Sequence, residues 1–280
     1  MRSDFAVFIL TYNRPDNLLT YETLMRSGYT GKVYIVCDDS DPSLNEYRKK
    51  FGDALLVFSK DEIAREFDQG DNFTDRRTIF FARNASWKLA EDVGVRYFIE
   101  LDDDYTSFLY RSPDKFGVLR GWNIRKIDKV FGLMVDFVES TGASTLAMSQ
   151  GGDHISGDRD LVARVTRKAM NSFVCDVQRP FPFMGRINED VNAYVSLGNR
   201  GKLFFTYWTL LLNQKQTQQT TGGMTDVYLD SGTYLKSFYS VMYAPSCVKV
   251  KWLASMRRFH HSINWNNAVP KIISERYRAA

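Results

Sequence analysis

The chain has few cysteines, and their arrangement suggests neither a covalent nor a zinc-bound framework. Its 280 residues include three, Cys37, Cys175 and Cys247, which are far apart and form no CxxC pair. An odd number of widely spaced cysteines argues against disulfides and against a structural zinc site. We therefore expect a protein of a reducing compartment, the cytoplasm.

Long hydrophobic runs are also missing. The longest apolar stretch, residues 203–212, is far shorter than the roughly 20 residues that cross a bilayer. The stretch at residues 5–10 is too short for the core of a secretion signal and lacks a small-residue cleavage site. The formal net charge of +4 permits an anionic partner without requiring one. We expect no membrane association, and the oligomeric state stays open.

The first hundred residues show a regular alternation. Runs that are apolar on both faces and separated by helices are typical of parallel strands in βαβ units. Apolar runs lie at residues 5–10, 32–40, 54–60 and 96–104, with helical spacing at 18–27, 45–51 and 78–93. The second half predicts helices at 127–141, 188–201 and 231–245 and strands at 145–153 and 201–214. No linker marks a boundary, so we predict an α/β fold with a mostly parallel central sheet in a single domain, 1–280.

Three adjacent aspartates, Asp102, Asp103 and Asp104, end the fourth apolar run. Adjacent carboxylates repel one another and disfavour a strand. Alternate side chains of an extended segment share a face, so Asp102 and Asp104 would point one way and Asp103 the other. Two hard oxygen ligands on one side suit Mg²⁺ or Mn²⁺. The spacing alone is equally compatible with a solvated strand end, or with the cap of a helix that begins at residues 105–109.

Polar residues follow other predicted strands as well. Backbone amides of residues 10–18 and Arg14 suit a diphosphate at a helix start, and Tyr12 suits stacking on a base. Asp38 and Asp39 are placed to accept hydrogen bonds from a nucleobase or ribose. Because ligands bind at the carboxyl ends of strands in such sheets, we expect these clusters to meet at one edge.

Longer strings carry a resemblance to one family. The chain resembles the TET/JBP-associated glycosyltransferases over roughly residues 5 to 275, and these are GT-A enzymes of phages and eukaryotes linked to modified DNA bases. The strings are DNFTDRRTIFFARN (71–84), FIELDDDYTSFLYR (98–111), QGGD (150–153), RKAMNSF (167–173), GRINEDVNAY (185–194), TTGGMTDVY (220–228), GTYLKSFYSVMYAPSCVKV (232–250) and HHSINW (260–265).

The resemblance implies a role for each matching residue. It implies a nucleotide-binding half, residues 1–110, and an acceptor-binding half, residues 111–280. Nucleotide-sugar binding falls to Thr11, Tyr12, Arg14, Asp38, Asp39, Arg77, Arg83, Asn84, Asp102, Asp103, Gly151 and Gly152. Metal binding falls to Asp104 and Asp102 with His260 or His261, and catalysis to Glu189 and Asp190.

The implied reaction is metal-dependent sugar transfer to DNA. The donor would be a UDP-sugar, UDP-glucose or a UDP-N-acetylhexosamine, used together with Mn²⁺ or Mg²⁺. The acceptor would be the hydroxymethyl group of 5-hydroxymethylcytosine or 5-hydroxymethyluracil. Arg77 or Arg83 and the metal would stabilise the leaving diphosphate. An inverting enzyme would use Asp190 or Glu189 as the base, whereas a retaining one would use the leaving phosphate. For a phage-encoded chain the compartment is the host cytoplasm.

Plainer interpretations stay open beside this one. Glu189 and Asp190 fit a helix start, His260 and His261 fit a surface pair, and Arg77 and Arg83 fit ion pairs with acids such as Asp75 and Asp92. Basic segments 159–168 and 251–258 suit either DNA phosphates or a solvated face. The polar segment 213–226 suits a loop that closes over the donor or the base. A protein or saccharide acceptor, or a non-catalytic nucleotide- or DNA-binding module, are the alternative functions.

Overall fold

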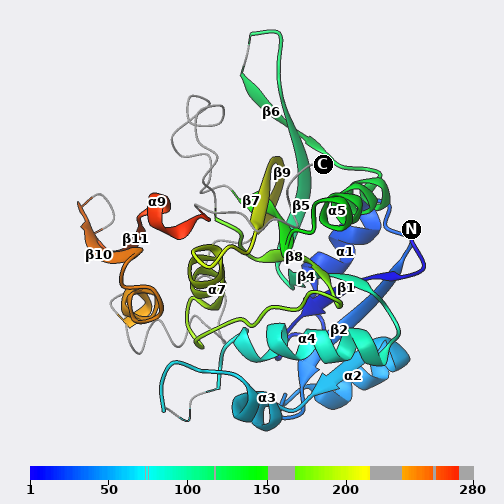
Figure 1. Cartoon of the computed structure of the whole chain (residues 1–280). Coiled ribbons are helices and arrows are strands. Elements are labelled where there is room, and N and C mark those ends of the chain that lie inside the picture. The colour runs from blue at the N-terminus through cyan, green and yellow to red at the C-terminus, as the bar shows by residue number, and fades with distance from the viewer. Residues whose placement is uncertain are drawn as a thin grey trace.

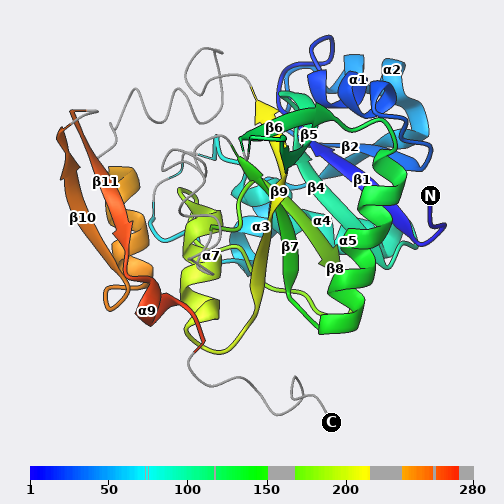
Figure 2. The same ribbon diagram turned by 90° about the horizontal axis from the view of Figure 1, so that it is seen from above.

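A central sheet organises the protein, seen here in a computed structural model that describes residues 1–72, 74, 76–116, 118–150, 168–214, 235–254 and 257–270. In these ranges nine strands form the sheet, in the order β3-β2-β1-β4-β8-β7-β9-β5-β6. Helices flank the sheet, and a separate two-stranded hairpin, β10–β11, lies beyond helix α7 (Figures 1 and 2).

The first half of the chain forms the parallel part of the sheet. β1 (Phe5–Leu10), β2 (Lys32–Asp38), β3 (Leu55–Phe58) and β4 (Tyr97–Asp102) all run the same way. They are joined through α1 (Leu19–Arg26), α2 (Leu44–Phe51) with the short 3-10 turn η1 (Gly52–Ala54), α3 (Lys60–Glu66) and α4 (Phe80–Asp92). The predicted βαβ alternation is confirmed.

The second half completes the sheet with mixed pairing. Its elements are β5 (Tyr105–Pro113), β6 (Leu119–Asn123), α5 (Ile127–Thr141), β7 (Thr145–Gln150), β8 (Ser172–Asp176), α7 (Glu189–Gly198) and β9 (Phe204–Gln214). β8 is antiparallel to β4 and to β7, β7 and β9 are parallel, and β5 is antiparallel to β9 and to β6. In the described chain, seven of the nine strands therefore share the direction of β1, which confirms the α/β fold with a mostly parallel sheet.

The segment after the triple aspartate is a strand. The alternative of a helix at residues 105–109 is wrong, because Tyr105–Pro113 forms β5 and pairs with β9. β4 ends at Asp102, and Asp103 and Asp104 form the turn into β5. The extended alternation that would oppose Asp103 to its neighbours therefore does not continue past Asp102.

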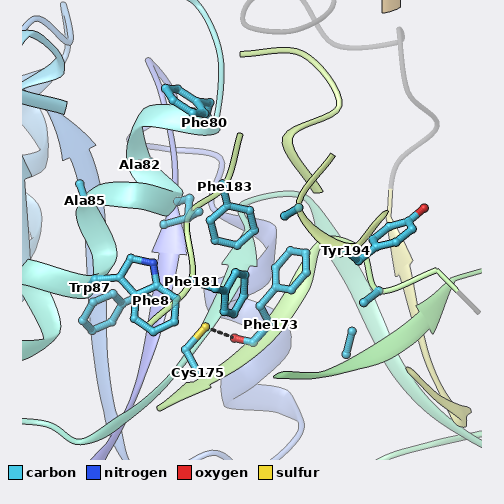
Figure 3. Packing of buried hydrophobic residues seen from close by; sticks show 14 of the residues in the cluster. Phe8, Phe80, Ala82, Ala85, Trp87, Phe173, Cys175, Phe181, Phe183 and Tyr194 are labelled. Carbon is cyan, nitrogen blue, oxygen red and sulfur yellow. Dashed lines mark hydrogen bonds between the residues drawn. The ribbon is translucent and has the colours of Figure 1, made fainter. Parts of the chain in front are cut away.

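The sheet is buried on both faces, which explains why its parallel strands are continuously apolar. Ala6, Phe8 and Leu10 of β1 pack into the cluster on the α4 side. Phe5, Val7 and Ile9 pack into the cluster that contains α5 residues such as Phe131. Figure 3 shows the α4 side, where aromatic rings meet edge to face: Trp87 lies 5.1 Å from Phe98 and 5.2 Å from Phe181 between ring centroids.

The last described part lies beside the sheet. It comprises a helix at residues 235–243, β10 (Val248–Leu253), β11 (Arg258–Ile263) and α9 (Trp265–Ala268). All three cysteines are free and buried, as predicted. Within the described ranges, none of the helices has the length and apolar character needed to cross a membrane.

Candidate active site

A cavity of about 410 Å³ opens at the carboxyl ends of β1, β2 and β4. Its size is within the usual range for small-ligand sites. The structure brings most of the predicted residues together there, from both halves of the chain: Thr11, Tyr12, Arg14, Asp38, Arg77, Arg83, Asp102, Asp103, Asp104, Glu189, Asp190, His260 and His261 all line it.

Some predicted residues lie elsewhere. Asn84 is buried outside the cavity lining, where its amide donates to the carbonyls of Phe80 and Phe183 and accepts from the Phe183 amide. Two of these hydrogen bonds tie α4 to residue 183, and Asn84 does not reach the cavity lining where it was predicted to contact the nucleotide. Asp39 is exposed and lines a neighbouring cavity together with Tyr12 and Arg77. Gly151 and Gly152 lie outside the described residues, as do most of the predicted loop at 213–226 and nearly all of the basic segment 159–168.

Arg83 is the centre of a buried ion cluster. Its guanidinium donates from Nε to Glu189 at 3.0 Å, from Nη1 to Glu100 at 3.3 Å and from Nη2 to Asp102 at 3.1 Å. The Arg83 side chain is 1% exposed. The predicted ion pair with Asp92 is therefore wrong for Arg83. One cation instead fixes the positions of three carboxylates, two from β4 and one from α7.

Three carboxylates around one cation leave an excess of negative charge in a buried environment. Burial raises the pKa of Asp102 and of Glu189 to about 7 and that of Glu100 to about 8, although Arg83 acts in the opposite direction on each. Burial alone would lower the pKa of Arg83, but Asp102, Glu189 and Glu100 together raise it above its ordinary value. A bound divalent cation would relieve this excess.

Asp103 anchors the loop between β1 and α1. Its two carboxylate oxygens accept hydrogen bonds from Arg14 Nη1 at 3.0 Å and from Thr11 Oγ1 at 2.7 Å. Tyr47 also accepts from the Arg14 amide at 2.8 Å. Burial raises the pKa of Asp103, and Arg14 opposes that shift. Asp103 therefore shapes the loop, whereas Asp102 and Asp104 remain the candidates for the metal.

Tyr12 and Asp38 form the far wall of the cavity. Lys60 pairs with Asp38 at 2.9 Å and lies over the Tyr12 ring, 4.7 Å from its centroid. Burial, followed by the charges of Asp38 and Asp41, raises the pKa of Tyr12. The result is an aromatic face beside a held carboxylate, which suits a nucleobase.

Glu189 and Asp190 begin helix α7 and face the cavity. Asn188 precedes them in the left-handed region, at φ 56°, which Asn tolerates better than most residues. This turn directs both acids inward: Glu189 meets Arg83, and Asp190 accepts from the Val191 amide at 2.7 Å. Glu189 and Asp190 are 6% and 9% exposed, so a solvated helix start does not describe them.

His260 and His261 reach the cavity from β11. Burial lowers the pKa of His260 to about 4 and of His261 to about 2, with Lys168 as the next cause. The Asn188 amide nitrogen, which also donates to the Lys236 carbonyl, lies 3.4 Å from His261 Nδ1. The same amide nitrogen donates to Ser240 Oγ at 3.1 Å. His261 is 6% exposed and His260 is only partly buried, so His260 is the more accessible of the two for a metal.

Two cations of the cavity, Lys60 and Lys236, were missed from the sequence, whereas Lys168 belongs to the basic segment 159–168 that was considered for DNA phosphates. Lys60, Lys168 and Lys236 line it together with Arg77. Burial lowers the pKa of Lys236, while Asp190 and Glu189 act to raise it. These lysines belong to segments far apart in the chain, so only the fold brings them together. Isolated lysines in the sequence gave no signal of this.

The donor chemistry fits a hard divalent cation. Carboxylate oxygens dominate the wall around Asp102 and Asp104, and Mg²⁺ commonly takes one or two carboxylates and completes its shell with water and phosphate oxygens. In the described parts of the chain, no three His, Cys, Asp or Glu side chains form a ready-made metal site. Ligand oxygens would therefore supply the remaining positions. Arg83 contacts Oδ1 of Asp102, so a ligand role there falls to Oδ2.

Comparison with solved structures found several similar chains at low sequence identity. Glucosyl-3-phosphoglycerate synthase from Mycobacterium tuberculosis, in complex with Mg²⁺ and UDP, is 11% identical with a TM-score of 0.46, over 92% of this chain and 87% of that chain. The same enzyme with Mn²⁺, UDP-glucose and phosphoglyceric acid gives 11% and 0.45, over 92% and 85%. S. aureus TarS 1–349 is 14% identical with a TM-score of 0.38, over 74% and 59%.

None of the curated protein sequences gave a significant match. The family comparison did: the model of the TET-associated glycosyltransferases matches residues 5–223. That range spans most of the chain and contains Asp102, Asp104, Glu189 and Asp190. The chain therefore belongs to the TET-associated glycosyltransferase family, which confirms the resemblance in its motifs and its predicted class of enzyme.

Proposed function

We propose that the protein transfers a sugar from a UDP-sugar to the hydroxymethyl group of a modified pyrimidine in DNA, with Mn²⁺ or Mg²⁺ bound. The observation that carries the proposal is the meeting of Asp102, Asp104, Glu189 and Asp190 with several lysine and arginine side chains in one cavity at the strand ends. Membership of the glycosyltransferase family supports the reaction, and the family's association with TET enzymes supports the acceptor.

The donor fits the wall formed by the first half of the chain. Tyr12 offers a face for the base, and Asp38, held by Lys60, offers oxygens for base or ribose donors. Asp103 holds Arg14, which lines the same cavity and would add positive charge beside a diphosphate. Arg77, Lys168 and Lys236 line the same cavity and add positive charge for the leaving group.

Asp104, Oδ2 of Asp102 and His260 would hold the cation. When bound, a divalent cation there supplies charge stabilisation to the diphosphate as it leaves. The metal does not replace Arg83, whose three hydrogen bonds already fix Asp102 and Glu189 relative to each other. Arg83 therefore positions both acids before any ligand enters.

Glu189 and Asp190 stand on the acceptor side. Arg83 holds Glu189, so that this carboxylate faces the oxocarbenium-like sugar, while Asp190 is the better placed base for the acceptor hydroxyl. In an inverting reaction Asp190 takes that proton. In a retaining reaction the leaving phosphate takes it, and the two carboxylates only stabilise charge.

We place donor binding in residues 1–110 and acceptor binding in residues 111–280 of one domain. A pyrimidine inside a duplex cannot reach Asp190 at the cavity wall, so the target base must leave the stack. Single-stranded DNA presents the same group without that cost.

A labelled-transfer experiment tests the proposal. The protein is incubated with Mn²⁺, with UDP-glucose or a UDP-N-acetylhexosamine, and with matched oligonucleotides that carry cytosine, 5-hydroxymethylcytosine or 5-hydroxymethyluracil. We expect label on a hydroxymethylated oligonucleotide and none on the cytosine control. Label on protein or free saccharide instead of DNA, or binding of nucleotide-sugar without turnover, would replace this function with another.

A further inference from the structure

An aromatic pair is exposed on the hairpin that carries the two site histidines. Trp252 of β10 lies directly opposite Phe259 of β11, with ring centroids 5.2 Å apart and ring planes at 68°. The two side chains are 54% and 40% exposed. Large exposed rings gathered in one place commonly mark a binding surface.

The pair lies on the face of the hairpin that carries His261. Val250 is paired with His261, and Trp252 and Phe259 each lie two residues further along their own strands. Residues two apart in a strand share a face, so the aromatic pair follows His261 at a distance of about 7 Å. Because His261 lines the cavity, a polymer whose reacting group enters there would pass over Trp252.

The surroundings of the pair carry charge of one sign. Between residues 235 and 270 the sequence contains five cations, Lys236, Lys249, Lys251, Arg257 and Arg258, and no aspartate or glutamate. Lys249 and Lys251 are exposed. The pairing of β10 with β11 puts them on the opposite face of β10 from Trp252.

We propose that the β10–β11 hairpin is the docking element for the acceptor strand, with Trp252 and Phe259 stacking on a nucleobase next to the target and the long side chains of Lys249 and Lys251 reaching its phosphates around the edge of β10. Aromatic faces flanked by cations are the combination that binds single-stranded nucleic acid. A second copy of the chain fits poorly, because it would set this acid-free cationic patch against its own like charge. The inference rests on the proposed function for its choice of DNA.

The test is fluorescence anisotropy with a labelled single-stranded oligonucleotide that contains 5-hydroxymethylcytosine. Trp252→Ala is expected to raise the Kd roughly 5- to 100-fold, and Trp252→Phe to restore most of the binding. Lys251→Ala is expected to reduce the slope of log Kd against log salt by roughly 0.7, whereas Trp252→Ala leaves that slope unchanged. Trp122→Ala is the matched control. Trp122 is also exposed, at 62%, and faces an aromatic partner, Tyr110, across a β-hairpin far from the cavity.

The outcomes separate this inference from the proposed function. Weakened DNA binding in Trp252→Ala but not in Trp122→Ala, with Mn²⁺-dependent UDP binding intact, supports the docking element even if no sugar reaches the DNA. Sugar transfer to DNA by the wild type, together with unchanged DNA affinity in Trp252→Ala, keeps the function and overturns the docking element. A change of oligomeric state in Trp252→Ala, measured by sedimentation, overturns it in favour of a self-association surface.

Discussion

Arg83 of α4 donates a hydrogen bond from Nε to Glu189 Oε1 of α7 at 3.0 Å, across 106 positions of sequence. The same guanidinium holds Asp102 at the end of β4. A single side chain thus sets the separation of the metal side of the cavity from its acceptor side. The acids of this site are held together by an internal cation before any ligand arrives.

Replacing Arg83 with alanine should damage both stability and catalysis. It would leave Glu100, Asp102 and Glu189 buried without their common cation, and breaking a buried ion pair costs about 3–5 kcal/mol. Chemical denaturation measures the loss. Arg179→Ala is the control: Arg179 also pairs with a buried acid, Asp176, but Arg96 still contacts that acid and the site lies outside the cavity lining. A smaller loss in Arg83→Ala than in Arg179→Ala would contradict the central role of Arg83.

Asp103 and Asp104 should separate by function although they are adjacent. Asp104→Asn is expected to remove Mn²⁺-dependent UDP binding with little effect on the thermal midpoint. Asp103→Asn weakens the hydrogen bonds from Thr11 and Arg14. We expect the free energy of unfolding to fall by about 1 kcal/mol, which lowers the thermal midpoint, and the Mn²⁺ affinity to be retained. Calorimetric titration measures the binding of Mn²⁺ and UDP, and thermal melts measure the midpoint. The reverse pattern would show that the metal belongs to Asp103.

Tyr12 should contribute to nucleotide affinity through its ring. Tyr12→Ala is expected to weaken UDP binding by about 1–3 kcal/mol if the uracil stacks there, whereas Tyr12→Phe keeps the ring and should bind nearly as the wild type does. Lys60 lies over one face of the same ring, so a base that stacks on that face would displace the lysine. Equal affinity in all three proteins would place the base elsewhere.

Asp128 should give the fold a pH dependence that is separate from the site. It accepts from the Thr30 amide at 3.0 Å and from the chain's amino terminus at 3.5 Å. Burial acts to raise the pKa of Asp128, but the bonds from Thr30 and the terminal amine prevail and lower it below its ordinary value. Its stabilising contribution is therefore complete above the unfolded-state pKa, roughly 3.9, and is lost as the pH falls through the lower folded-state value.

The comparison of Asp128→Asn with the wild type at two pH values checks this. A deficit of about 1 kcal/mol in unfolding free energy is expected at pH 7, shrinking towards pH 3. Asp16→Asn, at an exposed pair with Lys50, should change stability little at either pH. A deficit in Asp128→Asn that grows as the pH falls would have the wrong sign.

Sequence patterns predicted the strongly periodic elements best. The bounds of β1 and α5 agree with the predicted runs at 5–10 and 127–141, because both are long, periodic and buried. β5, β6, β10 and β11 were not predicted. Their exposed faces carry residues such as Tyr110, Trp122 and Trp252, so they lack the polar-out alternation that identifies a strand.

The candidate site was predictable where a motif follows a strand. Asp102, Asp104 and Tyr12 were found that way, since parallel strand ends meet at one edge, whereas Glu189 was found through the family resemblance. Arg83 was expected in the site, but its pairing with Glu100 and with Glu189 was not predicted. The two acids are 17 and 106 residues away from Arg83 in the sequence. Lys60, Lys168 and Lys236 reach the cavity only through tertiary packing, and no local pattern distinguishes them from surface lysines.

The most direct test is a crystal structure of the protein with Mn²⁺ and UDP. The account predicts manganese at about 2.0–2.2 Å from a carboxylate oxygen of Asp104, the diphosphate between that ion and the cavity cations, and uracil against Tyr12. Manganese or UDP bound outside this cavity, or UDP bound there with no ion near Asp104, would contradict it.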